Sequence, residues 1–162
     1  MSARRRLTLG LTAAVLVLTA LAGFLYITAY RPDQRIDDGA RAEAQRAAAD
    51  GAVALLTYTP ETAFANMAAA RELLTGDFRD YHDRLARTVI VPAAMDKKIS
   101  ATATVTATGM TSLSEDSAAV LVFLDQSTTT PEQQAPTITS VGAEVELQKV
   151  DGRWLISAFD AT

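Results

Sequence analysis

An uncharged apolar run near the N-terminus most strongly limits what this chain can become. Residues 7–30, LTLGLTAAVLVLTALAGFLYITAY, contain no acidic or basic residue. As a helix this run would be about 36 Å long, enough to cross the hydrocarbon core of a bilayer, which is roughly 30 Å thick. The sequence therefore predicts a transmembrane helix over residues 7–30, in contact with the lipid bilayer.

A cleavable signal peptide is the competing interpretation of this run. Residues 4–6 are all arginine, and Ala-Leu-Ala at residues 20–22 resembles a small-residue cleavage site. The apolar run continues past that site to residue 30, which favours an uncleaved anchor. Because the positive charge is concentrated before the run, we expect a single-pass protein of the cytoplasmic membrane. Residues 1–6 would be a basic tail inside, and the C-terminal domain would lie in a periplasm-like space.

The composition of residues 31–162 excludes several classes of function. They carry all 19 acidic residues and 12 of the 15 basic ones, so an acidic domain argues against nucleic acid as a partner. The chain has no cysteine and one histidine, which removes disulfides, thiolate nucleophiles and cysteine metal sites. No HExxH, EF-hand or GxGxxG spacing is present, so we expect no metal and no cofactor.

Residues 31–58 predict a first soluble helix, a stalk rich in alanine. Its narrow face carries small residues, with Gly51 allowing a close approach. We expect this face to pack on the domain's own sheet, although a seam between copies or with a partner is an alternative.

Two more amphipathic helices are expected to follow. Thr59 predicts the N-cap of the first, with Pro60 in its first turn, and Asp77 predicts the cap of the second. Pro92 is expected to kink or end the second helix. The two apolar stripes are Ala63, Phe64, Met67, Ala70 and Leu74, and then Phe78, Tyr81, His82, Leu85 and Val89.

From Ile99 onward the apolar period changes from that of a helix to that of a strand. Four strands are expected in an antiparallel meander, the second central and the last two joined by a hairpin at Asp151-Gly152. Helices followed by strands predict an α+β domain over residues 59–162, with residues 31–58 packed on it. A curved four-stranded sheet around three helices would form a cone with a mouth.

Large side chains on these elements are candidates for lining a pocket in the cone. They are Phe64, Met67, Tyr81, His82, Leu121, Phe123 and Trp154. A carboxylate or histidine in such a pocket could serve as a general base, which directs attention to His82, Tyr81, Asp77, Asp80 and Asp83. A lone histidine on an apolar stripe is more typical of a core, and the aspartates suit a cap or a solvated face, so we expect no enzyme and no catalytic residue.

The order and spacing of several segments resemble one known family. These are the basic N-terminus with its single span, the alanine-rich helix, the phrase LLTYTPETAFANMAAARELLTGDFRDYHDRL at residues 55–85, and VELQKVDGRWLISAF at residues 145–159. Together they are similar to the Mce-associated membrane proteins of actinobacteria. The resemblance implies a nuclear-transport-factor-two-like cone outside the cytoplasmic membrane. It also implies an accessory role with Mce complexes, which import lipids such as sterols and fatty acids, and Mce transporter subunits as partners.

Three other functions remain open from the sequence. A scaffold of a type IV-like secretion system would have the same topology and the same cone. A stand-alone lipid-binding module would use the cone's mouth, and a cone-fold enzyme would need His82 or Asp80 for its chemistry.

Overall fold

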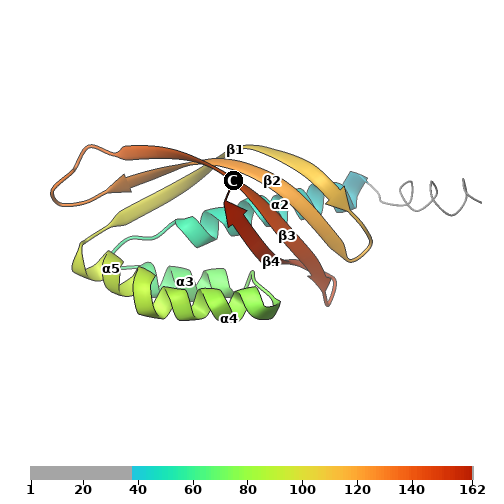
Figure 1. Cartoon of the computed structure of the whole chain (residues 1–162), viewed down its shortest axis with the longest axis horizontal. Helices are drawn as coiled ribbons and strands as arrows, with labels where there is room; N and C mark the ends of the chain where they lie inside the picture. Colours follow the sequence, from blue (N-terminus) through green and yellow to red (C-terminus); the bar gives the residue numbers. More distant parts are fainter. Residues whose placement is uncertain (1–37, 162) are drawn as a thin grey trace, which may run out of the picture. The chain divides into compact units, whose positions relative to one another are not determined.

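A computed structural model describes residues 38–161 as one α+β unit (Figure 1). The predicted tail and transmembrane helix, residues 1–6 and 7–30, lie outside the described residues, as does the start of the stalk. No helix within residues 38–161 is both long and apolar enough to cross a membrane. The α+β class and the order of helices before strands are as predicted from the sequence.

Helix α2, Asp38–Leu56, packs its small residues against the sheet. Its buried positions are Ala44, Ala48, Gly51, Ala52 and Leu55. A methyl group at residue 51 would overlap with Cδ1 of Ile156 on the last strand, so the helix backbone lies very close to the sheet. The expectation that this face packs on the domain's own sheet is therefore confirmed.

Helix α3, Ala63–Arg71, begins slightly later than the sequence predicts. Thr59 and Thr62 form the turn before it, in which each backbone N–H donates to the other's hydroxyl, at 3.2 and 3.3 Å. The N–H of Ala63 then donates to the carbonyl of Thr59 at 2.8 Å. Thr59 thus caps this entry turn, as in a capping box, and the regular helix starts only at Ala63.

The third predicted helix is a continuous helical segment made of α4, Gly76–Leu85, a π-helical turn, Ala86–Ile90, and α5, Val91–Asp96. Its N-cap is Thr75 and not Asp77, because the N–H of Arg79 already donates to the carbonyl of Thr75. Asp77 lies in the first turn, where the helix dipole favours a carboxylate. Pro92 has no N–H to donate, and the widened turn before it carries the helix on into α5.

The sheet has the predicted meander order β1-β2-β3-β4, all antiparallel. Its strands are β1, Ser100–Leu113, β2, Ser117–Thr129, β3, Thr137–Val150, and β4, Arg153–Ala161. Two bulges in β1 leave Thr106 and Thr111 out of register, and each hydroxyl donates to a carbonyl of β2. β2 is central as expected, and its buried residues Val120, Val122 and Leu124 all lie on the face toward the helices.

The hairpin between β3 and β4 turns at Asp151-Gly152, as predicted. Both residues have positive φ, 51° and 78°, which is the geometry of a tight type I′ turn. β4 also binds the loop between α3 and α4, because Ile156 donates to the carbonyl of Leu73 and accepts from the N–H of Thr75. This second pairing fixes α4 beside β4 and sets the position of the groove described below.

Candidate functional site

A groove lies between α3 and the segment formed by α4, the π-helical turn and α5. Its volume is about 200 Å³. Met67 and Ala86 form a buried apolar floor, and Val91 and the 66% exposed Phe64 stand at its sides. Met67 and Phe64 lie on α3, and the loop at Leu73–Thr75 joins this helix to α4. The width of the groove therefore depends on how closely this loop holds the two helices together.

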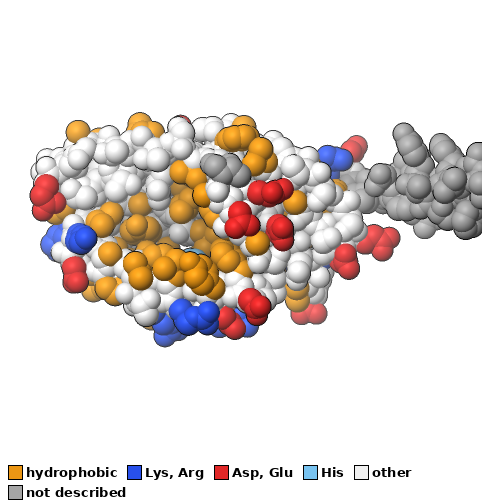
Figure 2. Space-filling model, viewed as in Figure 1, with side chains coloured by type: hydrophobic (Ala, Val, Ile, Leu, Met, Phe, Trp, Pro, Cys, Tyr) orange, Lys and Arg blue, Asp and Glu red, His pale blue; other side chains and the backbone are white. Residues whose placement is uncertain are grey.

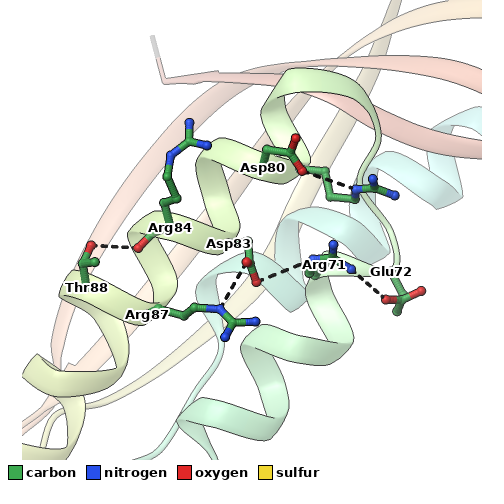
Figure 3. A network of polar contacts seen from close by, with 8 residues as sticks. Arg71, Glu72, Asp80, Asp83, Arg84, Arg87 and Thr88 are labelled. Atoms are coloured by element: carbon green, nitrogen blue, oxygen red, sulfur yellow. Dashed lines mark hydrogen bonds and ion pairs between the residues drawn. The ribbon is translucent and has the colours of Figure 1, made fainter.

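One end of the groove is charged. The carboxylate of Asp83 lies between two arginines, with Arg71 Nε 3.5 Å from Oδ1 and Arg87 Nε 3.1 Å from Oδ2 (Figure 3). Arg71 comes from α3, so this carboxylate joins the two helices. A further pair joins Arg71 to Glu72 at 3.4 Å. Two positive and two negative groups therefore largely neutralise each other, and the groove has no strong preference for an ion of either sign.

His82 is buried on α4, one of the helices that border the groove, but its side chain does not line the groove. It is 5% exposed, its ring centroid is 6.3 Å from that of Phe78, and neither ring nitrogen has a hydrogen-bond partner within residues 38–161. Burial lowers the pKa of His82, and the nearby charge of Asp83 opposes this effect. The imidazole is therefore neutral at pH 7, and among the described residues no carboxylate accepts its proton as a catalytic pair requires.

The structure divides the seven candidate lining residues among four places. Phe64 and Met67 line the groove. His82 and Trp154 are buried, and Lys149 Nζ lies 5.3 Å from the centre of the Trp154 ring. Tyr81 is 55% exposed on α4, where the sequence predicted a buried stripe. Leu121 and Phe123 lie on the face of β2 that points away from the helices, because their neighbours Val120, Val122 and Leu124 occupy the inner face.

The charged end of the groove was not anticipated from the sequence. The spacing of Asp83 and Arg87, four residues apart on one helix, is a pairing signal that sequence inspection could have used. The second partner, Arg71, comes from another helix and follows only from the packing of α3 on α4. Asp77 and Asp80 do not line the groove, and no group of three or more potential metal ligands occurs within residues 38–161.

Two curated proteins of Mycobacterium tuberculosis are similar to this chain over most of its length. The uncharacterized protein Rv1362c is 42% identical over 161 residues, covering 96% of this chain and 73% of its own length. The outer membrane protein Rv1973 is 46% identical over 121 residues, covering 75% of each chain. This chain belongs to their family. No family model matches the sequence.

Solved structures with a similar fold include a protein of a type IV secretion system. An IcmL-like type IV secretion system protein of Legionella pneumophila superposes with a TM-score of 0.63 and 11% identity, covering 75% of this chain and 91% of that one. The periplasmic domain of DotI superposes with a TM-score of 0.59 and 18% identity, covering 78% of this chain and 95% of that one. VirB8 of Agrobacterium tumefaciens superposes with a TM-score of 0.60 and 10% identity, covering 75% of this chain and 90% of that one. This chain therefore has the α+β fold of these domains.

Proposed function

We propose that the protein is a non-catalytic scaffold of a transport complex in the cell envelope. Residues 7–30 anchor it in the cytoplasmic membrane, and residues 38–161 form a binding domain on the outer side. The single observation that carries this proposal is the fold, which this chain shares with an IcmL-like type IV secretion system protein and with the periplasmic domain of DotI. The relative Rv1973 is named an outer membrane protein, which supports a place in the envelope for the family.

The chemistry of the groove also supports binding over catalysis. Its charged groups are already paired with each other, and His82, the one histidine, is buried outside it.

The size of the groove bears on the lipid-binding alternative. The groove has a volume of about 200 Å³, which is smaller than the roughly 300–1,000 Å³ of typical small-molecule pockets. A stand-alone lipid carrier would need more space than this, so it is the weakest of the non-catalytic alternatives.

Two kinds of transport complex are candidates for the partner. A type IV-like secretion complex is supported by the fold of the solved neighbours. An Mce-type lipid importer is supported by the resemblance of residues 55–85 and 145–159 to the Mce-associated membrane proteins. The role proposed is the same in both, which is to stabilise or assemble other subunits through surface contacts.

A pull-down of the tagged full-length protein from its native membrane in mild detergent tests this function. The expected result is recovery of transport-complex subunits at reproducible ratios, identified by mass spectrometry. Mce subunits and their permease would assign the lipid importer, and secretion-channel subunits would assign the secretion scaffold. Recovery of the protein alone, with the membrane fully solubilised, would overturn the proposal. A variant with residues 7–30 exchanged for an unrelated transmembrane helix separates contacts of the domain from contacts of the anchor.

A further inference from the structure

The face of the sheet that points away from the helices carries exposed apolar side chains at its centre. Side chains alternate between the two faces of the sheet along β2. Val120 and Val122 on the inner face are fully buried, whereas Phe123 on the outer face is 44% exposed. Leu121 lies on the same face and is partly buried. The helices lie on the opposite side of the sheet (Figure 1), and Phe123 does not belong to the hydrophobic core formed there.

The residues beside Phe123 are small on both neighbouring strands. Ala107 of β1 and Gly142 of β3 are its cross-strand partners. In the next row Leu121 lies between Gly109 and Glu144. These small neighbours leave the ring of Phe123 and one side of Leu121 open to a partner. The outward-facing residues of a sheet in contact with water are usually polar, so apolar residues at these positions are unusual.

Three carboxylates border this apolar centre on β3 and β4. Glu144 and Asp160 are directly opposite each other in the pairing of these strands, and Glu146 is the next residue of β3 on the same face. Figure 2 shows a group of acidic side chains over β3 and β4 close to the end of β4. Within residues 38–161 none of the three forms an ion pair, and Glu144 receives only a long hydrogen bond, 3.4 Å, from the hydroxyl of Thr111.

Like charges directly opposite each other in a sheet destabilise it. Arg153, a basic residue on this side of β4, pairs in register with Val150 at the hairpin and not with the acidic group. Within residues 38–161 no basic side chain therefore forms an ion pair with these carboxylates.

A shallow hollow extends this face at one end. It has a volume of about 200 Å³ and adjoins the acidic group through Glu146. Ser112, Ala119, Gln148 and Ser157 are among its other lining residues. Hydroxyl, amide and carboxylate oxygens around a small hollow suit the end of a lysine or arginine side chain, which offers only donors.

We propose that this outer sheet face, formed by Ala119, Leu121, Phe123, Gly142, Glu144, Glu146 and Asp160, docks a basic segment of a partner protein. An apolar side chain of the segment covers Phe123 and Leu121, and its lysines or arginines pair with the carboxylates. This inference rests on the proposed function, since the partner is a subunit of the complex. Charge complementarity selects the occupant, because a second copy of this acidic face, an anionic lipid surface or a nucleic acid would be repelled.

Site-specific photo-crosslinking in the full-length, membrane-bound protein tests the docking surface. The photoreactive amino acid p-benzoylphenylalanine replaces Phe123, and in a matched control it replaces Met95, which is 56% exposed on α5. We expect position 123 to crosslink to a subunit of the complex, within a segment richer in lysine and arginine than in acidic residues, at ten or more times the yield of position 95. A crosslink to a second copy, to lipid or to an acidic segment would overturn the inference.

Charge reversal gives a second and independent measurement. Glu144→Lys with Asp160→Lys is expected to lower recovery of the crosslinked subunit at least tenfold, and changing basic residues of the crosslinked segment to glutamate should restore it. Glu43→Lys with Asp50→Lys makes the same change in net charge on the exposed side of α2 and should leave recovery unchanged. Circular dichroism checks that both variants are folded.

The outcomes separate the docking surface from the proposed function. If subunits co-purify equally with all variants, the inference about the outer sheet face is wrong and the scaffold function stands. If no subunit co-purifies with the unsubstituted protein, the scaffold function is wrong and the inference falls with it.

Discussion

Gly51 of α2 lies against Ile156 of β4, so close that a Cβ on residue 51 would overlap with the Cδ1 atom of Ile156. Gly51→Ala should therefore force the helix or the isoleucine to shift, at a cost of about 1–3 kcal/mol in the free energy of unfolding. Urea unfolding, followed by the fluorescence of the single tryptophan, Trp154, measures this cost.

Gly109→Ala is the matched control for this substitution. A Cβ on residue 109 meets nothing within 4 Å, and its backbone has no positive φ. We expect its effect to stay within about 0.5 kcal/mol, as for other unstrained surface positions. Equal losses in the two variants would show that the contact between α2 and Ile156 is not the cause.

The buried His82 predicts a specific dependence of stability on pH. Burial holds the pKa of His82 below the 6.5 of an unfolded chain, so at acidic pH the unfolded state takes up a proton more readily than the folded state. The stability associated with neutral His82 is fully present above pH 6.5 and is lost as the pH falls below it. We expect the free energy of unfolding to drop more between pH 7.5 and 5.0 in the unsubstituted protein than in His82→Phe.

Because the chain has one histidine, the difference between these two proteins isolates its titration from that of the carboxylates. Urea unfolding at both pH values gives the comparison. Identical pH dependence in the two proteins would mean that water reaches the ring nitrogens of His82 in solution.

The carboxylate of Asp83 joins α3 to α4, so its removal should loosen the groove. Asp83→Asn weakens the pairs to Arg71 and Arg87, which are about one-third and two-thirds exposed. For pairs this open to solvent we expect a loss of about 1 kcal/mol that shrinks in 1 M salt. Asp80→Asn, whose pair with Arg79 spans 3.8 Å between two exposed side chains, should change stability by less than half as much.

The helix and strand order followed from local patterns that the fold preserves. The small face of α2 around Gly51 predicted its packing on the sheet, and Asp151-Gly152 predicted the hairpin, because both depend on residues close in sequence. The candidate site was harder to predict. Phe123 was assigned to the pocket because β2 is apolar on both faces, and only the strand register shows that it lies opposite the core.

Helical periodicity failed near the groove for a different reason. Val89 belongs to the predicted stripe of α4, yet it is 52% exposed, because the π-helical turn at Ala86–Ile90 changes the phase of the helix. The ion pair between Arg71 and Asp83 joins residues of two helices, and no local pattern contains it. The pair between Arg71 and Asp83 and the outward position of Phe123 were missed because the packing of separate elements creates them, whereas the exposure of Val89 follows from a turn within one helical segment.

The acidic pair on the outer sheet face predicts a variant that gains stability while it loses binding. Neutralising either member, by Glu144→Gln or Asp160→Asn, removes the repulsion between β3 and β4 and should raise the free energy of unfolding by about 0.2–1 kcal/mol. The gain should disappear in 1 M salt, which screens the repulsion in the unsubstituted protein. Glu115→Gln, in the turn between β1 and β2, is the control and should change nothing. Co-purification of partner subunits should weaken in the two stabilised variants. Weaker binding by a more stable protein cannot result from unfolding, whereas unchanged binding would leave the repulsion between Glu144 and Asp160 without a role in docking.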